Sequence, residues 1–337
     1  MIWTSQHAIL STEVPSLSPT KLHLCLPWDA IIWEADTAES WASLMSNHRP
    51  KAFLPVLKTY LTTASRNPYL LNSFSCIIIL HGLILIALDL QSCEQMTTEP
   101  ITFHSKPWRF LIIRAYETWK TAFDNFTKVT ISTLPEHQSA EFQKGCTATL
   151  ALYHVASIAL YIPLTDLQIY AGARHILGRY IGPAEQARAI HNVQNWAASG
   201  NMDGAVAVSH AALLIRDGIT KLQNWDAGDA FHYPWCLYLA TLACWAFMAG
   251  IPENRTDAYP SEATNHVHSE DADWDAKAEM NALISAITRA KPEDLWRIRG
   301  RYRVYDLPRV IARSLEGVRW AVVQEGVLVL RGLRQGR

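Results

Sequence analysis

The densest group of metal-ligating residue types lies in one polar stretch of the chain. Its members are His266, His268, Glu270, Asp271, Asp273 and Asp275. Hard cations take several oxygen ligands, and zinc takes three or four ordered nitrogen, sulfur or oxygen ligands. The sequence around this group lacks a helical pattern that would order such ligands. We therefore interpret it as a solvated loop and expect no metal site.

Pairs of acids could instead support diphosphate chemistry, as in all-helical enzymes that resemble terpene cyclases. The two candidate pairs are Asp226 with Asp229 and Asp271 with Asp273. Neither lies in an acid-rich helical run that would hold magnesium and diphosphate. The chain also lacks G-x-S-x-G, G-x-G-x-x-G and G-x-x-x-x-G-K-[ST]. We therefore assign no catalytic residue and predict that the protein is not an enzyme.

Three histidines, His81, His154 and His210, stand in apolar helical stretches. A histidine in such a place is usually a core residue whose ring nitrogens are hydrogen-bonded. A ligand-binding or switching role stays open for each of them.

The six cysteines are scattered rather than paired. They are Cys25, Cys76, Cys93, Cys146, Cys236 and Cys244. Without C-x-x-C spacing they predict no zinc finger and no binuclear zinc cluster. Their mostly apolar neighbours indicate free, buried thiols in a reducing compartment.

The composition is that of a folded protein with a large core. The 337 residues are 49% hydrophobic and 18% charged, which excludes a disordered chain and a coiled coil. The formal net charge is −1, but residues 289–337 contain 12 basic and 5 acidic residues. Within this block, Arg297, Arg299, Arg301 and Arg303 form a candidate patch for weak electrostatic contact with DNA. A solvated helix face is the alternative interpretation.

Helical patterns account for most of the chain. Short helices are expected from Asp29 to Glu34 and after the capping residue Thr37, and a longer one from Ser105 to Phe126. The apolar run from Cys76 to Leu88 is shorter than the roughly 20 residues of a membrane span. We interpret that run as a buried core helix and expect no membrane contact.

Further helices follow in the second half of the sequence. One covers 150–161, one runs from an Asp203 cap to a stop at Gly218, and one opens at Pro234. An exposed acidic loop is expected at about 251–275, and helices follow it up to the C-terminus. The sequence has no alternating pattern of apolar and polar residues long enough to predict a β-strand instead of these helices. The predicted fold class is all-α, a single large multi-helix array or bundle without a significant sheet.

Several blocks together resemble the fungal-specific transcription factor domain, the regulatory region of fungal zinc-finger transcription factors. The similarity is greatest to the branch in which this domain follows two-cysteine, two-histidine fingers. The blocks are Leu26-Pro27-Trp28-Asp29 with Trp33-Glu34-Ala35 and Thr37-Ala38-Glu39-Ser40-Trp41, Leu80-His81-Gly82-Leu83, Tyr153-His154 to Gly172 with Leu177-Gly178-Arg179, Ala187 to Ala197, Phe231-His232-Tyr233-Pro234-Trp235 to Trp245, and Leu315 to Arg331. Each block is weak alone, but their order and spacing make the set fairly specific.

The resemblance implies a ligand- or partner-responsive regulatory domain over residues 25–335, preceded by an extension over 1–24. Such a domain would control RNA polymerase II transcription of metabolic or biosynthetic genes from the nucleus, with the cytoplasm as a second location. Implied partners are the transcription machinery or another protein, a small apolar effector and a second copy of the chain in a homodimer, with DNA contacted only indirectly or weakly.

A complete family member carries a zinc module upstream, and Met1–Leu24 contains no cysteine. We therefore expect no cofactor in this chain and zinc only in the missing DNA-binding module. A truncated gene product, an excised domain and a paralogue that lost its fingers are three open explanations.

The candidate pocket wall combines residues from two of these blocks. It consists of His154, Asp166, Gln168, Tyr170, His232, Trp235 and Trp245. Aromatic and polar side chains on packed helices can hold an apolar ligand or a partner helix. Plain core packing is the alternative for most of these residues. The alternative function is a stand-alone helical protein that acts as an enzyme or binds a small molecule.

Overall fold

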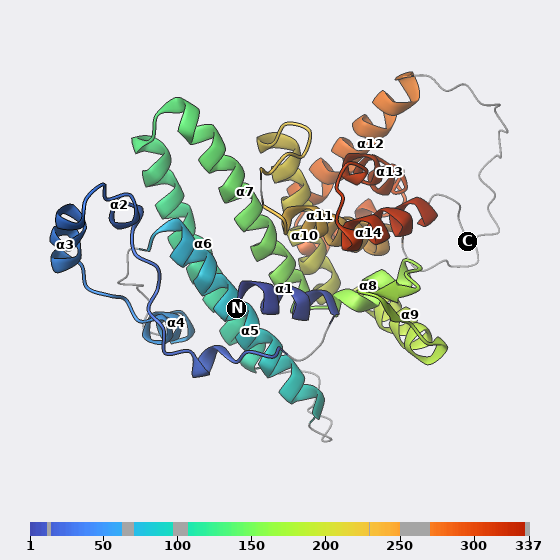
Figure 1. Cartoon of the computed structure of the whole chain (residues 1–337). Coiled ribbons are helices and arrows are strands. Elements are labelled where there is room, and N and C mark those ends of the chain that lie inside the picture. Colours follow the sequence, from blue (N-terminus) through green and yellow to red (C-terminus); the bar gives the residue numbers. More distant parts are fainter. Residues whose placement is uncertain (12–14, 63–70, 97–106, 229, 250–269, 334–337) are drawn as a thin grey trace, which may run out of the picture. The chain divides into compact units, whose positions relative to one another are not determined.

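A computed structural model of the chain describes residues 1–11, 15–62, 71–96, 107–228, 230–249 and 270–333, and side chains at 95, 96, 107 and 270–274 are not described. The all-α prediction is confirmed, because a two-stranded hairpin, His175–Ile176 with Arg179–Tyr180, is the only sheet in these residues. The described helices form two compact units, Met1–Phe142 and Gln143–Arg337. We call them unit 1 and unit 2 and describe each by itself (Figure 1).

Unit 1 is built around one long apolar helix. In chain order its elements are α1 (Ile2–Ser11), the 3₁₀ turn η1 (Pro19–Lys21), α2 (Ala30–Trp33), α3 (Ala38–Asn47), α4 (Phe53–Leu61), α5 (Ser73–Met96), α6 (Pro107–Thr133) and the start of α7 (Glu136–Ala159). Helix α5 packs against α1, η1, α4 and α6. His81 on α5 is buried, and its Nδ1 lies 2.6 Å from the Ser5 hydroxyl oxygen on α1. The predicted caps of the short helices are partly confirmed, since the Thr37 hydroxyl accepts a hydrogen bond from the Ser40 amide at 3.1 Å.

Helix α6 meets α5 through aromatic side chains. The indole Nε1 of Trp119 donates to the carbonyl of Cys76 at 2.9 Å, and the Trp119 ring stacks on Phe123 at 4.9 Å. Phe110, although aromatic, lies outside the buried face of α6 and is 69% exposed. The buried stripe is formed by Ile112, Ala115, Tyr116, Trp119 and Phe123. Trp119 and its partners thus set the face that α6 turns inward.

Helix α5 is longer than the predicted core run. Residues Ser73–Glu94 are long and apolar enough to cross a membrane by length and composition alone, which the 13-residue run did not suggest. Many of its side chains are buried by the helices of unit 1, including Ile79, Leu80, Leu83 and Leu85. That burial is typical of the core helix of a globular protein, so the absence of membrane contact remains our prediction.

The start of α5 is tied to the first family-like block. The Asn72 side chain accepts from the Ser75 amide at 2.8 Å, which caps the helix. Its amide nitrogen donates to the carbonyls of Pro27 and Trp28, both at 3.1 Å, and to the Asp29 carboxylate at 3.0 Å. One side chain therefore caps a helix and holds an extended segment far away in sequence.

Unit 2 surrounds a second apolar helix. It contains most of α7, then α8 (Leu164–Tyr170), β1 (His175–Ile176), β2 (Arg179–Tyr180), α9 (Pro183–Ala197), α10 (Met202–Lys221), α11 (Tyr233–Ala249), α12 (Glu270–Arg289), η2 (Pro292–Ile298), α13 (Asp306–Leu315) and α14 (Ala321–Gly332). Helix α11 packs against α8, α9, α10, α13 and α14. Most of its residues are buried, including both of its cysteines, so α11 is the core of this unit.

Three predicted boundaries in unit 2 were wrong. Asn201, not Asp203, caps α10, because its side chain accepts from the Asp203 amide at 3.0 Å. Gly218 does not stop α10 but lies inside it, where a Cβ would meet the Tyr233 hydroxyl at 2.3 Å. Helix α12 begins at Glu270, so the predicted acidic loop does not extend to residue 275. Residues 251–269 of that loop lie outside the described part of the chain.

Four of the six cysteines are buried, as expected: Cys76, Cys146, Cys236 and Cys244. The other two, Cys25 and Cys93, are exposed, which corrects the expectation for them. None of the six, all of which lie in the described residues, forms a disulfide. Burial raises the pKa of the Cys236 and Cys244 thiols above the ordinary value, which makes both poor nucleophiles.

Helix packing in unit 1 predicts the effect of one glycine substitution. A Cβ at Gly82 on α5 would lie 2.9 Å from the Phe53 ring and 3.0 Å from Leu57 on α4. We expect Gly82→Ala to lower the free energy of unfolding by about 1–3 kcal/mol, the usual cost of overpacking. The exposed helical Gly145 has open space around its Cα, so Gly145→Ala should raise stability by about 0.5–1 kcal/mol. Urea unfolding of both variants tests this, and equal effects of the two would contradict the packing argument.

Candidate functional site

A cavity of about 670 Å³ lies in unit 2, within the usual range for small-molecule sites. Its wall is drawn from α8, the loop before β1, α9, α11, α14 and the start of α13. The lining residues are Ile169, Tyr170, Ala171, Gly172, Ala173, Arg174, His175, Gln186, Ile190, Trp245, Ala249, Tyr305, Glu325, Leu328, Val329, Gly332 and Leu333. We call it the unit 2 cavity.

The end of α8 gives this cavity one of its walls. The Gly172 amide bonds to the Ile169 carbonyl at 2.9 Å, and the Ala173 amide bonds to the Gln168 carbonyl at 3.0 Å. With Gly172 at a φ of 100°, these bonds form a Schellman cap. The cap stops the helix and turns the chain along the rim of the cavity.

The hairpin that follows holds this rim in place. Leu177 and Gly178 both have positive φ, 50° and 80°, as a two-residue turn of the primed type requires. Ile176 and Ile181 on either side pack with Ile169 and Ala189 in a small buried cluster. Leucine is costly in the left-handed region, so this packing offsets local backbone strain.

Two of the predicted pocket residues lie together in the cavity. The rings of Tyr170 and Trp245 are 5.7 Å apart and tilted by 47°. Burial, with a contribution from nearby Tyr305, raises the pKa of the Tyr170 hydroxyl, so it stays a neutral donor and acceptor at neutral pH. The Trp245 indole Nε1 is buried and finds no hydrogen-bond partner among the described residues.

Asp166 and Gln168, also predicted, lie beside the cavity rather than in its wall. The buried Asp166 carboxylate accepts from the Asn192 amide at 2.8 Å and lies 3.8 Å from the Arg188 guanidinium. The Gln168 amide donates to the Leu164 carbonyl within α8 at 3.4 Å. Asp166 therefore joins α8 to α9, and both residues position the wall.

The remaining predicted pocket residues belong to the core around α7, α10 and α11. His154 and His210 meet through their Nδ1 atoms at 3.1 Å, beside the ring of Tyr153. Burial lowers the pKa of His210 to about 4, which keeps it neutral at pH 7. His232 Nε2 donates to the Ala148 carbonyl at 2.9 Å, and burial lowers its pKa as well. Trp235 is buried.

Sequence reasoning missed the part of the cavity that comes from the C-terminal helices. Tyr305 is half exposed, Leu328 is 67% exposed, and Glu325 is half-buried. One signal in the sequence could have indicated this part of the cavity. Leu328 is an apolar residue that falls outside the buried face of α14. Only the packing of α14 against α11 shows that these side chains reach the same cavity as Trp245.

The structure does not bring the four predicted arginines together as one patch. Arg297 pairs with Asp294 at 2.9 Å, and Arg303 lies 3.8 Å from Asp275. Arg299 points inward, where it donates to the Ala197 carbonyl and its guanidinium lies 4.1 Å from the ring centre of Phe247. Burial lowers the pKa of Arg299. Arg301 is exposed.

In the described part of the chain, no group of three or more histidine, cysteine, aspartate or glutamate residues could hold a metal ion. His266 and His268 of the acidic run lie outside the described residues, as does Asp229 of the other acid pair. The absence of a metal or cofactor therefore stays a prediction.

The fold and the cavity define an all-helical protein with a site of small-molecule size. The chain is 36% identical over 338 residues to the nicotinate catabolism cluster-specific transcription factor of Emericella nidulans, across 98% of this chain and 37% of that protein. It is 29% identical over 338 residues to zinc finger protein klf1 of Schizosaccharomyces pombe, across 98% of this chain and 40% of that protein. The first of these fungal homologues is by name a transcription factor and the second a zinc finger protein, in agreement with the resemblance found in the sequence.

The chain spans about two fifths of the length of these curated relatives. No family model matches the chain. No solved structure matches it either.

The histidine pair predicts how stability depends on pH. His210 has a folded pKa near 4 against an ordinary value of 6.5, so its contribution is fully present above pH 6.5 and is lost as the pH falls towards 4. We expect His210→Leu to reduce the loss of stability over this range, measured by urea unfolding at several pH values. The exposed His191→Leu is the control and should follow the wild type. An unchanged pH profile for His210→Leu would contradict the assignment.

The inward position of Arg299 predicts that this arginine contributes more to the stability of the fold than the exposed Arg301. Arg299→Ala removes the contact with Phe247 and the bond to Ala197, so it should lower the free energy of unfolding by about 1–3 kcal/mol. Arg301→Ala is the matched control and should stay within about 0.5 kcal/mol of the wild type. Thermal unfolding of both variants measures the difference. Equal stabilities would show that Arg299 is as solvated as its neighbour.

Proposed function

We propose that the chain is the regulatory region of a fungal transcription factor that controls RNA polymerase II transcription of metabolic or biosynthetic genes. The similarity to the Emericella nidulans protein carries the proposal, because it extends over 98% of this chain. The name of that relative links it to a catabolic gene cluster, which is a metabolic target of the proposed kind. The region acts in the nucleus and is not an enzyme.

In this proposal the region responds to an effector held in the unit 2 cavity. Tyr170, Trp245 and Tyr305 supply aromatic surface, and Glu325 with Gln186 supplies polar atoms at the wall. A buried indole without an acceptor is unfavourable, and an effector with an acceptor atom would satisfy the Trp245 Nε1. Because the wall joins α8, α11 and α14, a ligand that binds one packing of these helices better would shift the population towards it.

DNA recognition is assigned, within the proposal, to a zinc module elsewhere in the whole protein. The arrangement of the four arginines supports this, because one is half-buried and points inward and two are near carboxylates. Partners of the region would be the transcription machinery or a second copy of the chain.

A reporter assay tests the regulatory role. The chain, fused to an unrelated DNA-binding module in yeast nuclei, should change reporter transcription about fivefold or more relative to the module alone. The double variant Tyr305→Ala, Leu328→Asp alters two exposed side chains of the cavity and should shift this output. The matched control is Phe110→Ala, Val129→Asp, which alters two exposed side chains of α6 outside the cavity.

Two results would contradict the proposal. A folded, nuclear fusion with no effect on the reporter would exclude a transcriptional role for the region. A double variant that behaves like the wild type would exclude control through the unit 2 cavity while leaving the transcriptional role in place.

A further inference from the structure

We propose that unit 1 contains a second binding site, an apolar cavity that takes an uncharged apolar small molecule. This inference goes beyond the proposed function, because it rests on a different unit and on different residues.

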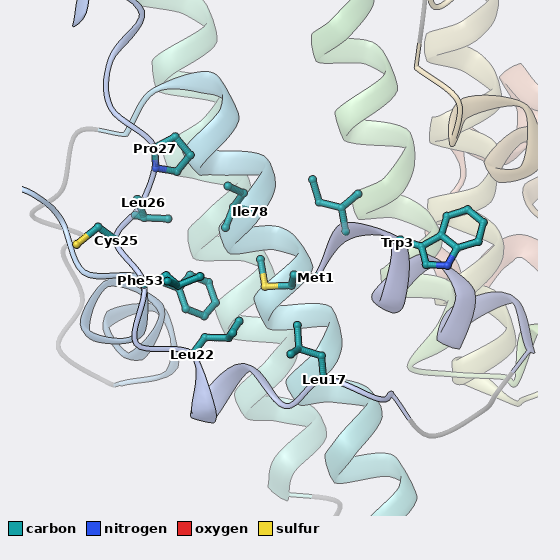
Figure 2. Close-up of a pocket in the computed structure, with 11 residues that line it drawn as sticks. Met1, Trp3, Leu17, Leu22, Cys25, Leu26, Pro27, Phe53 and Ile78 are labelled. Carbon is teal, nitrogen blue, oxygen red and sulfur yellow. The ribbon is translucent and has the colours of Figure 1, made fainter. Parts of the chain in front are cut away.

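The unit 1 cavity has a volume of about 550 Å³, which is within the range for ligands the size of a small organic molecule. Figure 2 shows its wall, which is formed by the start of α1, the extended segment that leads to Pro27, the start of α4 and one turn of α5. The lining residues are Met1, Ile2, Trp3, Leu17, Leu22, Leu24, Cys25, Leu26, Pro27, Phe53 and Ile78.

The chemistry of the wall selects against cations. None of the lining side chains is a carboxylate, an ammonium, a guanidinium or an imidazole, and their only heteroatoms are the Met1 thioether, the Trp3 indole and the Cys25 thiol. Because the wall offers no carboxylate, a cationic ligand would lose its hydration here without gaining an ion pair, which is costly. An uncharged apolar ligand gains by removing its surface from water, at about 25 cal/mol per Å².

The wall is fixed by backbone bonds. Leu26 donates to the Lys51 carbonyl at 2.8 Å, and Phe53 donates to the Leu24 carbonyl at 2.9 Å, so a β-bridge joins the extended segment to the start of α4. Asn72 holds the same segment through the Pro27 carbonyl. These bonds keep the segment from closing onto α5, so the cavity is preformed and binding costs little ordering.

The cavity is also accessible. Trp3 and Leu24 on its wall are 72% and 67% exposed, and Cys25 between Leu24 and Leu26 is exposed and free.

Binding can be measured with N-phenyl-1-naphthylamine, an uncharged apolar fluorophore. We expect enhanced fluorescence with micromolar affinity. Dodecylammonium, which combines an apolar chain with a cation, should compete less well than lauryl alcohol, because the wall has no carboxylate to pair with it. These measurements use the full chain.

Two matched pairs of variants locate the site. Ile78→Phe fills the cavity and should weaken binding by about tenfold or more, whereas Ile77→Phe, at the neighbouring half-buried position of α5, should not. Leu24→Asp places an anion on the wall and should also weaken binding. Ile31→Asp, a similarly exposed apolar position of unit 1 outside the cavity, should have no effect. The Leu24 variant alters an exposed residue, so it tests the site without disturbing the core.

Three results would overturn the proposal. They are the absence of any fluorescence enhancement, equal affinities of Ile78→Phe and Ile77→Phe, and an affinity that Leu24→Asp leaves unchanged. In the last case the fluorophore would be binding elsewhere, for example in the unit 2 cavity, and the reporter prediction would be unaffected.

Discussion

The burial of α11 on every side is the constraint on which unit 2 depends. A helix without a polar face cannot lie at a surface, so other helices must surround it. Helices α8, α9, α10, α13 and α14 pack against it. Helix α13 has Leu307, Val310, Ile311 and Leu315 turned inward.

The unit 2 cavity is a consequence of that arrangement. Helix α8 ends early at its Schellman cap, while α11 and α14 continue past it, so the space beyond the cap is not filled by α8. The hairpin closes one side of this space and Tyr305 lies at another. A strained Leu177 is tolerated there because the isoleucines on either side are buried. The strained turn at Leu177 is therefore part of the backbone that forms the wall of the unit 2 cavity.

Much of the fold could be predicted from helical periodicity, capping residues and prolines. The all-α class, the Thr37 cap and the helix around Pro234 followed from local signals. Which face of α6 is buried could not be predicted in this way. Phe110 is exposed, and the contact of Trp119 with α5 decides which face is buried. Tyr170 and Trp245 were found from their family-like blocks, whereas Tyr305 and Leu328 depend on long-range packing that periodicity does not encode.

The unit 1 cavity escaped the sequence analysis for a related reason. Its wall is an irregular segment held by backbone bonds, and such bonds leave no pattern of side chains. The role of Asn72 in holding the extended segment could not be predicted either, since it depends on three partners far away in sequence. Positions of this kind are set by tertiary structure, and a single sequence gives no signal for them.

The buried cysteines have one more consequence. Cys76 lies on α5 in unit 1, whereas Cys146, Cys236 and Cys244 lie on α7 and α11 in unit 2. A thiol that is shielded in the folded state can react only when its helix opens, so its rate of modification reports the free energy of that local opening. The chain therefore carries natural probes of internal motion in both units, and an oxidant would reach these sulfurs only in proportion to how often each core opens.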